Sequence, residues 1–354
     1  MFSKLPFFLS TPLWFYFVFS SAFCMESLQE EATASPGYTV VFKKEDFSPL
    51  PEDPWKPLPI TKLPDDFKRM LRKKNGVKKD GVEAFFLKLE MKDEKSNPTL
   101  QRTDDYIYDP SIRIGSGDGG VVYLGRHSPS QRYVALKAVK AFNSNPEEQE
   151  DYCGWKQAGR LFACYKKPMG SYSTFLLYIP LVIGETLAEI QDSREFMKNL
   201  GIENKGSGKI KEISYSQWEI NQRLLQSFVE EYKFCKKKGA MQDTDSSNFL
   251  LTSDLQKIVY IDLEACISTK KDSIRGNDLI YLQKLLGYPA YYYVPSYNYK
   301  EGAIVLPPPV WEFNQKIAAR RVKNKSMSIK EVETLLNNLD KGMIRLQASE
   351  KKHN

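Results

Sequence analysis

Four short stretches of this 354-residue chain carry polar groups whose types and spacing suit the transfer of a phosphate group. "GSGDGGVV" has glycines at G-x-G-x-x-G spacing, "VALK" ends on Lys137, "MQDTDSSNFLL" contains Asp243 and Asn248, and "VYIDLE" contains Asp262. Glycine backbone can lie close over phosphates, an ammonium can contact their oxygens, and carboxylate and amide oxygens suit Mg²⁺. Each stretch alone has an ordinary explanation as a turn, a cap or an exposed lysine. In this order, the set predicts a nucleotide-phosphate site.

The residues around the glycines separate two kinds of nucleotide site. A dinucleotide-binding fold needs a strand before the glycines and a helix after them. Here the β-like run "VVYLGR" follows, so the glycines are expected to bend between two strands, as in kinases. On the next strand Ala135 and Lys137 share a face, where the small alanine leaves room for a base. The residues assigned to the phosphate-covering loop are Ile114, Gly115, Ser116, Gly117, Asp118, Gly119, Gly120 and Val122.

The elements expected around these stretches give an α+β fold in which a β-rich part precedes a helical part. "VVYLGR", "RYVALKAV" and "STFLLYIPLVIG" are predicted strands, and "PEEQEDYCGWKQAGRLFACY" is a predicted helix that begins at Pro146. "YSQWEINQRLLQSFVEEYKFCKKKG" predicts an amphipathic helix that stops at Gly239. Two strands with a turn at Ser253 and Asp254 follow. The rest is helical in "NDLIYLQKLLG", "VWEFNQKIAARRVKNK" and "IKEVETLLNNLDKGMIRLQ".

Over about residues 110 to 290 the sequence resembles the protein-kinase superfamily. The resemblance implies a bilobal protein-kinase-like fold, with a small β-rich N-lobe and a mainly helical C-lobe. It also implies ATP as the donor and Mg²⁺ as the cofactor. Lys137 would contact the α- and β-phosphates, Asp243 would be the catalytic base, and Asn248 and Asp262 would be Mg²⁺ ligands.

The resemblance also implies partners for these groups. A glutamate of the following helix would pair with Lys137. Glu147, Glu148 and Glu150 are available, and Glu150 is preferred. Asp278 is expected to buttress the catalytic loop. Asp245 is a rival base, but its spacing to Asn248 is too short for the family pattern, which assigns it to hydrogen bonding within the loop.

Three departures from the family pattern bear on activity. Met241 and Gln242 stand where a His-Arg pair is expected, and Leu263-Glu264 replaces Phe-Gly after Asp262. Fifteen residues separate Asp262 from Asp278, with no Ala-Pro-Glu motif among them. A conventional peptide-docking activation segment does not fit this gap, and in this respect the chain resembles RIO-type and small-molecule kinases.

The expected function is therefore a divergent phosphotransferase that acts on a hydroxyl acceptor, with protein serine or threonine preferred. One alternative is a secreted pseudokinase that serves as a binding module, which the lost His-Arg pair and activation segment favour. A second alternative is a small-molecule or sugar kinase. The net charge of +7 is mild for this length, so nucleic acid is not an expected partner.

The ends of the chain predict its organisation and location. Residues 1–24 are expected to be a cleaved signal peptide, which predicts a secreted protein, or one delivered into another cell, without a stable membrane span. The alternative is membrane anchoring by an uncleaved signal. Residues 25–105 are expected to form a proline-rich and basic extension, 106–182 the N-lobe, 183–345 the C-lobe and 346–354 a polar tail. The basic run "FKRMLRKKNGVKKDG" favours a solvated helix face over a nuclear signal or an anionic contact. Asn324 in "NKS" is a candidate glycosylation acceptor.

Cysteine and histidine limit the other chemistries. Beyond the leader the cysteines are Cys153, Cys164, Cys235 and Cys266, which allow either two disulfides or free buried thiols. With only His127 and His353, a His-dependent catalytic triad and a multi-His metal site are excluded.

Overall fold

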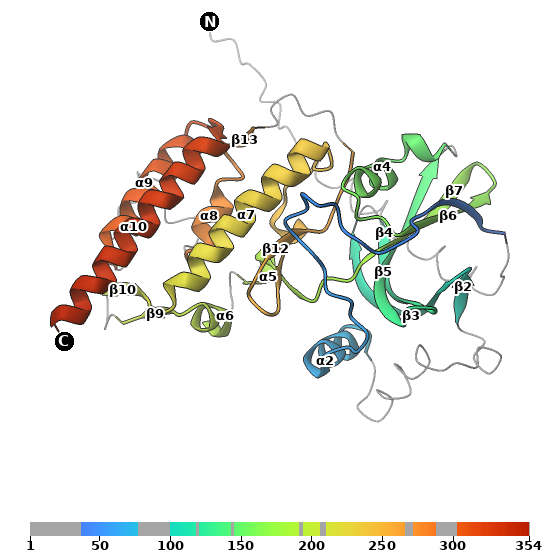
Figure 1. Ribbon diagram of the computed structural model, residues 1–354, viewed down its shortest axis with the longest axis horizontal. Helices are drawn as coiled ribbons and strands as arrows, with labels where there is room; N and C mark the ends of the chain where they lie inside the picture. Colours follow the sequence, from blue (N-terminus) through green and yellow to red (C-terminus); the bar gives the residue numbers. More distant parts are fainter. Residues whose placement is uncertain are drawn as a thin grey trace, which may run out of the picture.

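The computed structural model describes residues 37–76, 100–117, 120–142, 145–190, 194–205, 210–265, 272–287 and 303–353. A seven-stranded antiparallel sheet occupies one end of the molecule and a group of helices the other (Figure 1). The expected α+β class is therefore confirmed. The predicted signal peptide, Asp118, Gly119 and Cys266 lie outside the described residues.

The large sheet has the strand order β1-β6-β7-β5-β4-β3-β2. Side chains alternate between its two faces along β5, so Ala135 and Val139 join the main core while Leu136 and Ala138 join a smaller one. This burial on both faces explains why the strands read as continuous apolar runs, as predicted for three of them. The strands are β1 (Thr39–Lys43), β2 (Gln101–Thr103), β3 (Tyr106–Gly117), β4 (Gly120–His127), β5 (Arg132–Phe142), β6 (Ala163–Met169) and β7 (Tyr172–Pro180).

The connection between β5 and β6 is helical for a shorter distance than predicted. A 3-10 turn, η4 (Pro146–Glu148), leads into α4 (Glu150–Gln157), so the predicted start at Pro146 holds. The predicted helix was wrong in extending over "LFACY", because Gly159 adopts a left-handed φ of 68° and Ala163 already begins β6. Left-handed glycine ends a helix, and the apolar run beyond it is buried in the sheet.

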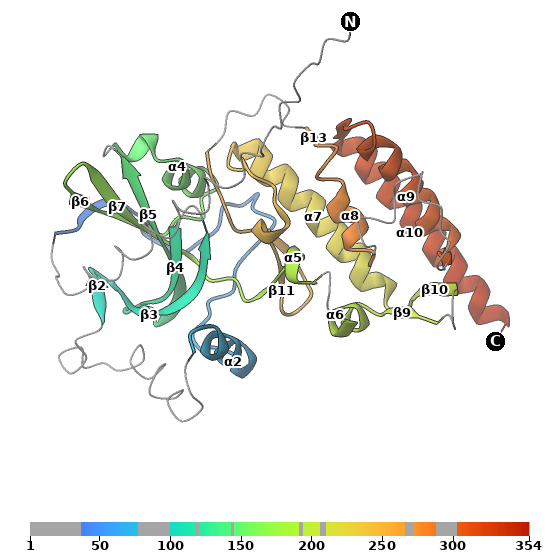
Figure 2. The same cartoon turned by 180° about the vertical axis from the view of Figure 1, so that it is seen from behind.

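The other end of the molecule is built on the long helix α7, with α10 packed against both α7 and α9 (Figures 1 and 2). α7 ends where predicted, at Gly239 with a φ of 65°. The predicted polar tail is the last part of α10. These helices are α5 (Leu187–Ile190), α6 (Arg194–Asn199), α7 (Trp218–Lys238), α8 (Ile280–Lys284), α9 (Pro308–Arg321) and α10 (Ile329–His353).

Short strands connect the two ends. β11 (Phe249–Thr252) and β12 (Ile258–Tyr260) form the predicted pair around a turn, and β8 (Gly184–Thr186) pairs with β11. The 3-10 turn η5 (Ser246–Asn248) directly precedes β11. The remaining strands are β9 (Ile202–Asn204), β10 (Ile210–Tyr215), β13 (Ser273–Ile274), β14 (Ala303–Val305) and β15 (Met327–Ser328).

The described part of the predicted N-terminal extension belongs to this fold. β1 pairs antiparallel with β6. The first part of the basic run, up to Lys74, lies in α2 (Asp65–Lys74), whose Phe67 and Leu71 are buried in the main core. Removal of residues up to 105 would therefore uncover the sheet.

A buried charge cluster joins this N-terminal segment to both ends of the molecule. Arg160, just after α4, is 2% exposed and donates hydrogen bonds to both carboxylate oxygens of Asp53, at 2.8 and 2.6 Å. It also donates to both oxygens of Glu231 on α7, at 2.6 and 2.8 Å. The guanidinium carbon lies 5.2 Å from the ring centroid of Trp55 and 5.1 Å from that of Phe234.

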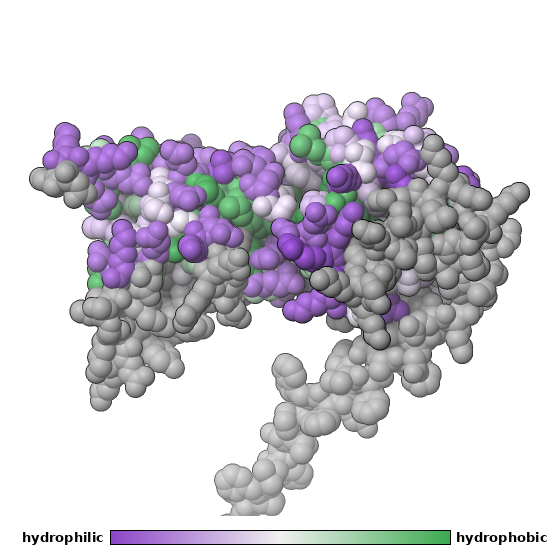
Figure 3. All heavy atoms as spheres, turned by 90° about the horizontal axis from the view of Figure 1, so that it is seen from below, coloured by the Kyte–Doolittle hydropathy of each residue, from purple (hydrophilic) through white to green (hydrophobic). Residues whose placement is uncertain are grey.

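Three of the cysteines, the helices and one face of the surface can be described. Cys153, Cys164 and Cys235 are buried free thiols, so no disulfide joins these three. Within the described ranges, no helix is both long and apolar enough to cross a bilayer. Hydrophilic side chains predominate on the face shown in Figure 3, where hydrophobic ones form small separate groups.

Candidate active site

The centre of the candidate site is the ammonium of Lys137 on β5, whose side chain is 8% exposed. Its Nζ donates to Oδ1 of Asp262 at 2.6 Å, across 125 residues of sequence, and also pairs with Oδ1 of Asp151 on α4. Burial alone lowers the pKa of Lys137, but Asp151 and Asp262 outweigh it, so the pKa lies above its ordinary value. The lysine is therefore a positive charge that is held between α4, through Asp151, and the segment after β12, through Asp262.

The lysine's partner on the helix is Asp151, so the preference for Glu150 was wrong. Both residues lie in the first turn of α4, but Asp151 is 4% exposed whereas the side chain of Glu150 is exposed to solvent. One residue turns a helix by about 100°, which is enough to direct neighbouring side chains to different surroundings. Glu147 and Glu148 are in η4 and are also exposed.

The segment after β12 is docked directly on α4, and this brings Asp262 to Asp151. The backbone N–H of Ala265 donates to the carbonyl of Glu150 at 2.9 Å. Gly154 lets the two backbones approach, because a Cβ atom there would lie 2.5 Å from the carbonyl oxygen of Leu263. The sequence signal for this contact is a lone glycine in a helix, where glycine is otherwise unfavourable.

Gly154→Ala should therefore separate α4 from the Asp262 segment. A Cβ at 2.5 Å from a backbone oxygen forces one of the two elements to move, since neither is a flexible side-chain end. We expect a lower midpoint of thermal unfolding and, for the Mg²⁺·ATP that the kinase resemblance implies, weaker binding by calorimetry. Gly170→Ala is a matched control for folding, since a Cβ there meets nothing within 4 Å but its φ of 65° carries backbone strain. Unchanged nucleotide binding in Gly154→Ala would contradict a role for this contact.

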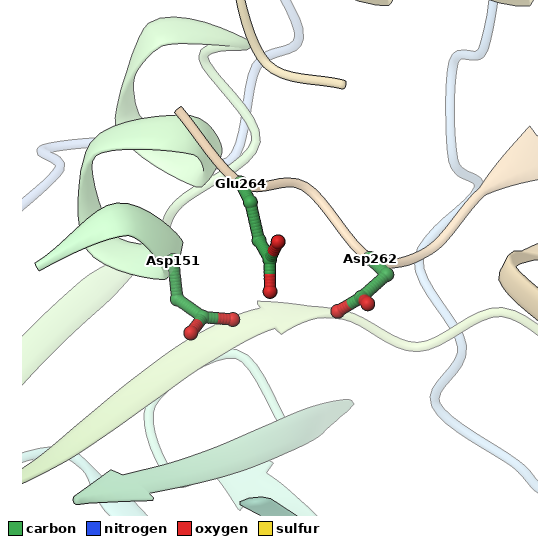
Figure 4. A group of neighbouring side chains, drawn as sticks. All are labelled: Asp151, Asp262 and Glu264. Carbon is green, nitrogen blue, oxygen red and sulfur yellow. The ribbon is translucent and has the colours of Figure 1, made fainter. Parts of the chain in front are cut away.

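Three carboxylates, those of Asp151, Asp262 and Glu264, point toward one another (Figure 4). Ligand oxygens of Asp151, Asp262 and Glu264 all lie within 4.8 Å of one another. Burial, and next the charges of Asp262 and Asp151, raise the pKa of Glu264 to about 7. The group is rich in the hard oxygen ligands that Mg²⁺ prefers, and Glu264 was not among the predicted ligands.

The glycine turn lies beside Lys137, as predicted. Gly117 and Gly120 face each other across β3 and β4, and Val122 is the register partner of Lys137. Gly120 has a φ of 143°, and a Cβ there would lie 2.2 Å from the carbonyl oxygen of Ala138. Only glycine lets β4 begin so close to β5.

Strand β3, which leads into the glycines, is hydrogen-bonded to the end of α2. The sequence did not predict this contact. The side chain of Asn75 donates to the carbonyl of Arg113 at 2.9 Å and accepts from its N–H at 3.0 Å. Ile114 is half-buried against the core, while Ser116 is exposed. The N-terminal segment therefore supports the predicted phosphate loop.

The polar stretch "MQDTDSSNFLL" forms a loop that ends in η5. Asn248 donates its amide to Oδ2 of Asp243 at 3.3 Å, and its carbonyl accepts from the N–H of Ile261 at 2.9 Å. These bonds place the side chain of Asn248 on exposed Asp243 and its backbone next to the residue preceding Asp262. The two predicted metal ligands, Asn248 and Asp262, are thus linked by a backbone hydrogen bond from Ile261, the residue before Asp262, to Asn248.

Asp278 and Asp245 hold this loop as expected. Asp278, 3% exposed, accepts from the hydroxyl of Thr244 at 2.6 Å, from Tyr232 at 2.7 Å and from Arg275 at 2.8 Å. Asp245 accepts from the N–H and hydroxyl of Ser247 at 2.8 and 2.7 Å, and these bonds lower its pKa. The predicted buttress and the predicted loop role are both confirmed.

Comparison of the sequence with models of known protein families gave no match, and comparison with curated proteins gave none either.

Proposed function

We propose that this chain is an ATP- and Mg²⁺-dependent phosphotransferase of the protein-kinase type, with a bilobal fold. The observation that carries the proposal is the position of Lys137. It lies beside a glycine turn, 2.6 Å from the carboxylate of Asp262, and in contact with an acid of the helix that follows its strand. A kinase needs this combination of a phosphate-covering turn, a strand lysine, a helix acid and a metal-binding aspartate.

The order of the elements supports the same proposal. Strands β3, β4 and β5 are followed by α4 and then by β6 and β7, and the loop of Asp243 comes after the long helix α7. A β-rich half that contributes the turn and lysine then faces a helical half that contributes Asp243, Asn248 and Asp262. Asp151 stands where the family has a glutamate, and its side chain is shorter by one methylene.

The oxygen groups present fit a magnesium ion. Asp262 and Asn248 would hold it, and Glu264 adds a third oxygen ligand that the family pattern lacks. When bound, Mg²⁺ neutralises charge on the transferred phosphate. Lys137 would orient the α- and β-phosphates, and the backbone of Gly117 and Gly120 would cover them.

The reaction would be an in-line displacement. The acceptor hydroxyl oxygen forms a bond to the γ-phosphorus, the bond from that phosphorus to the bridging oxygen of ADP breaks, and the hydroxyl proton passes to Asp243. Asn248 holds the Asp243 carboxylate at 3.3 Å, and Asp278 fixes the adjacent Thr244. Catalysis would then rest on positioning and charge.

A thermal unfolding experiment on the full chain tests the proposal. Mg²⁺·ATP at about a hundred times its dissociation constant should add about 2.7 kcal/mol of stability. The increase should require Mg²⁺ and should be lost in Lys137→Ala and Asp262→Asn. Lys140→Ala is the matched control, because this lysine of the same strand contacts the ring of Tyr172 rather than the site. A folded protein with no metal-dependent shift would refute the nucleotide site.

A further inference from the structure

Two cations beside the Asp243 loop have no carboxylate partner at ion-pair distance among the described residues. Lys284 ends α8, and its Nζ lies 5.3 Å from the ring centroid of Tyr281. Arg321 ends α9 and donates to the neutral side-chain oxygen of Gln283 at 2.5 Å. Both side chains belong to residues of intermediate exposure.

The contacts of α8 place this pair against the loop. The hydroxyl of Tyr281 donates to the backbone carbonyl of Thr244, which stands between Asp243 and Asp245. The ammonium of Lys284 lies over the ring of Tyr281. The side chain of Gln283, the residue before Lys284, accepts a hydrogen bond from Arg321. Both cations are thus held by residues of α8, the helix whose Tyr281 bonds the loop of the proposed base.

This arrangement is unfavourable for the protein alone. Burial lowers the pKa of Lys284, Asp245 opposes that effect, and Arg321 adds to it, so the net pKa is lowered. Burial also lowers the pKa of Arg321. Two like charges are partly removed from water, where Arg321 contacts a neutral amide and Lys284 an aromatic ring, so both would gain from an added anion.

We propose that Lys284 and Arg321 bind an oxyanion carried by the acceptor, so that the substrate presents a phosphate or carboxylate group near its hydroxyl. Arginine offers paired donors to such a group and lysine a mobile point charge. The charge of Asp245, which interacts with that of Lys284, would draw the lysine toward the loop when no anion is bound. This inference rests on the proposed function for the meaning of the anion, but the site can be measured without nucleotide.

The test is anion binding by the full chain in the Lys137→Ala background, which removes the proposed nucleotide site. Inorganic phosphate and malonate are titrated separately at constant ionic strength, and the unfolding midpoint is followed. We expect saturable stabilisation by one of them, which identifies phosphate or carboxylate as the recognised group. Lys284→Gln and Arg321→Gln should each weaken binding about tenfold or more, equivalent to the loss of about 1.4 kcal/mol.

Lys325→Gln is the matched control, since it removes an exposed lysine just beyond α9 and should leave binding within twofold. The unfolding midpoint of ligand-free Lys284→Gln should equal or exceed that of its parent, because a partly buried charge is removed. Absence of saturable stabilisation by both anions, or full retention of binding in the Lys284→Gln/Arg321→Gln double variant, would overturn the inference. A failure of ATP binding in the unmodified chain would refute the proposed function. The anion titration would still decide whether Lys284 and Arg321 bind an oxyanion, because it uses no nucleotide.

Discussion

Asp243→Asn is expected to lower ATP turnover by about 10²- to 10⁴-fold, the usual contribution of a positioned proton acceptor. The amide keeps the size of the side chain and can still contact Asn248, but it cannot take the hydroxyl proton. Binding of Mg²⁺·ATP should change little, because Asp243 is exposed and bonds neither Lys137 nor Asp262 among the described contacts. Turnover is measured as ADP release by the full chain, with binding measured by calorimetry on the same sample.

Asp245→Asn provides the matched control for this prediction. Asp245 caps η5, and asparagine is as good a cap as aspartate, so stability should change little while turnover stays within a few-fold of the original. The opposite pattern would transfer the role of base to Asp245. If the unmodified chain binds Mg²⁺·ATP without turnover that depends on either aspartate, the binding-module alternative takes the place of the enzyme.

The parts of the site that the sequence revealed are those with local signals. A glycine turn between two β-like runs and a lysine on the next strand depend on residues within about twenty positions of one another. Gly239 ends α7 by such a signal, whereas the Asp278 buttress, 34 residues from Thr244, was implied by the kinase resemblance. Turn chemistry and strand alternation determine such features before any distant contact is known.

The parts that the sequence did not reveal depend on distant packing. The kinase resemblance implied a glutamate as the partner of Lys137, so Asp151 was not among the candidates. Helical periodicity alone does not say which acid of the first turn of α4 meets Lys137, and that acid is Asp151. Gly154 could be identified only once the Leu263 backbone was known to pass over it. Asn75 reaches Arg113 across 38 residues, and no local pattern predicts that pairing.

The Arg160 cluster is the strongest case of such distant pairing. Asp53 and Glu231 are 107 and 71 residues away from Arg160, and the side chains of all three are at most 2% exposed. Glu231 also accepts from the N–H of Tyr260 at 2.9 Å, two residues before Asp262. Since Arg160 follows α4, which carries Asp151, the cluster helps to fix the two acids of Lys137 relative to each other.

Arg160→Met should therefore lower the free energy of unfolding by about 3–5 kcal/mol, the cost of leaving buried charges without their partner. Methionine is apolar and of similar length, so the loss would come from the carboxylates of Asp53 and Glu231 rather than from a large cavity. Urea unfolding followed by tryptophan fluorescence measures the change, with Trp55 next to the substituted residue as one reporter.

Arg320→Met separates this effect from the loss of any arginine ion pair. Arg320 bonds Glu331 at 2.8 Å, but the two side chains are 40% and 49% exposed, so solvent screens the pair and the expected loss is below about 1 kcal/mol. Equal losses in the two variants would mean that burial of the Arg160 cluster carries no special energy. A large loss in Arg160→Met alone would show that this buried cluster, to which the N-terminal segment contributes Asp53 and α7 contributes Glu231, stabilises the fold that brings Asp151 and Asp262 to Lys137.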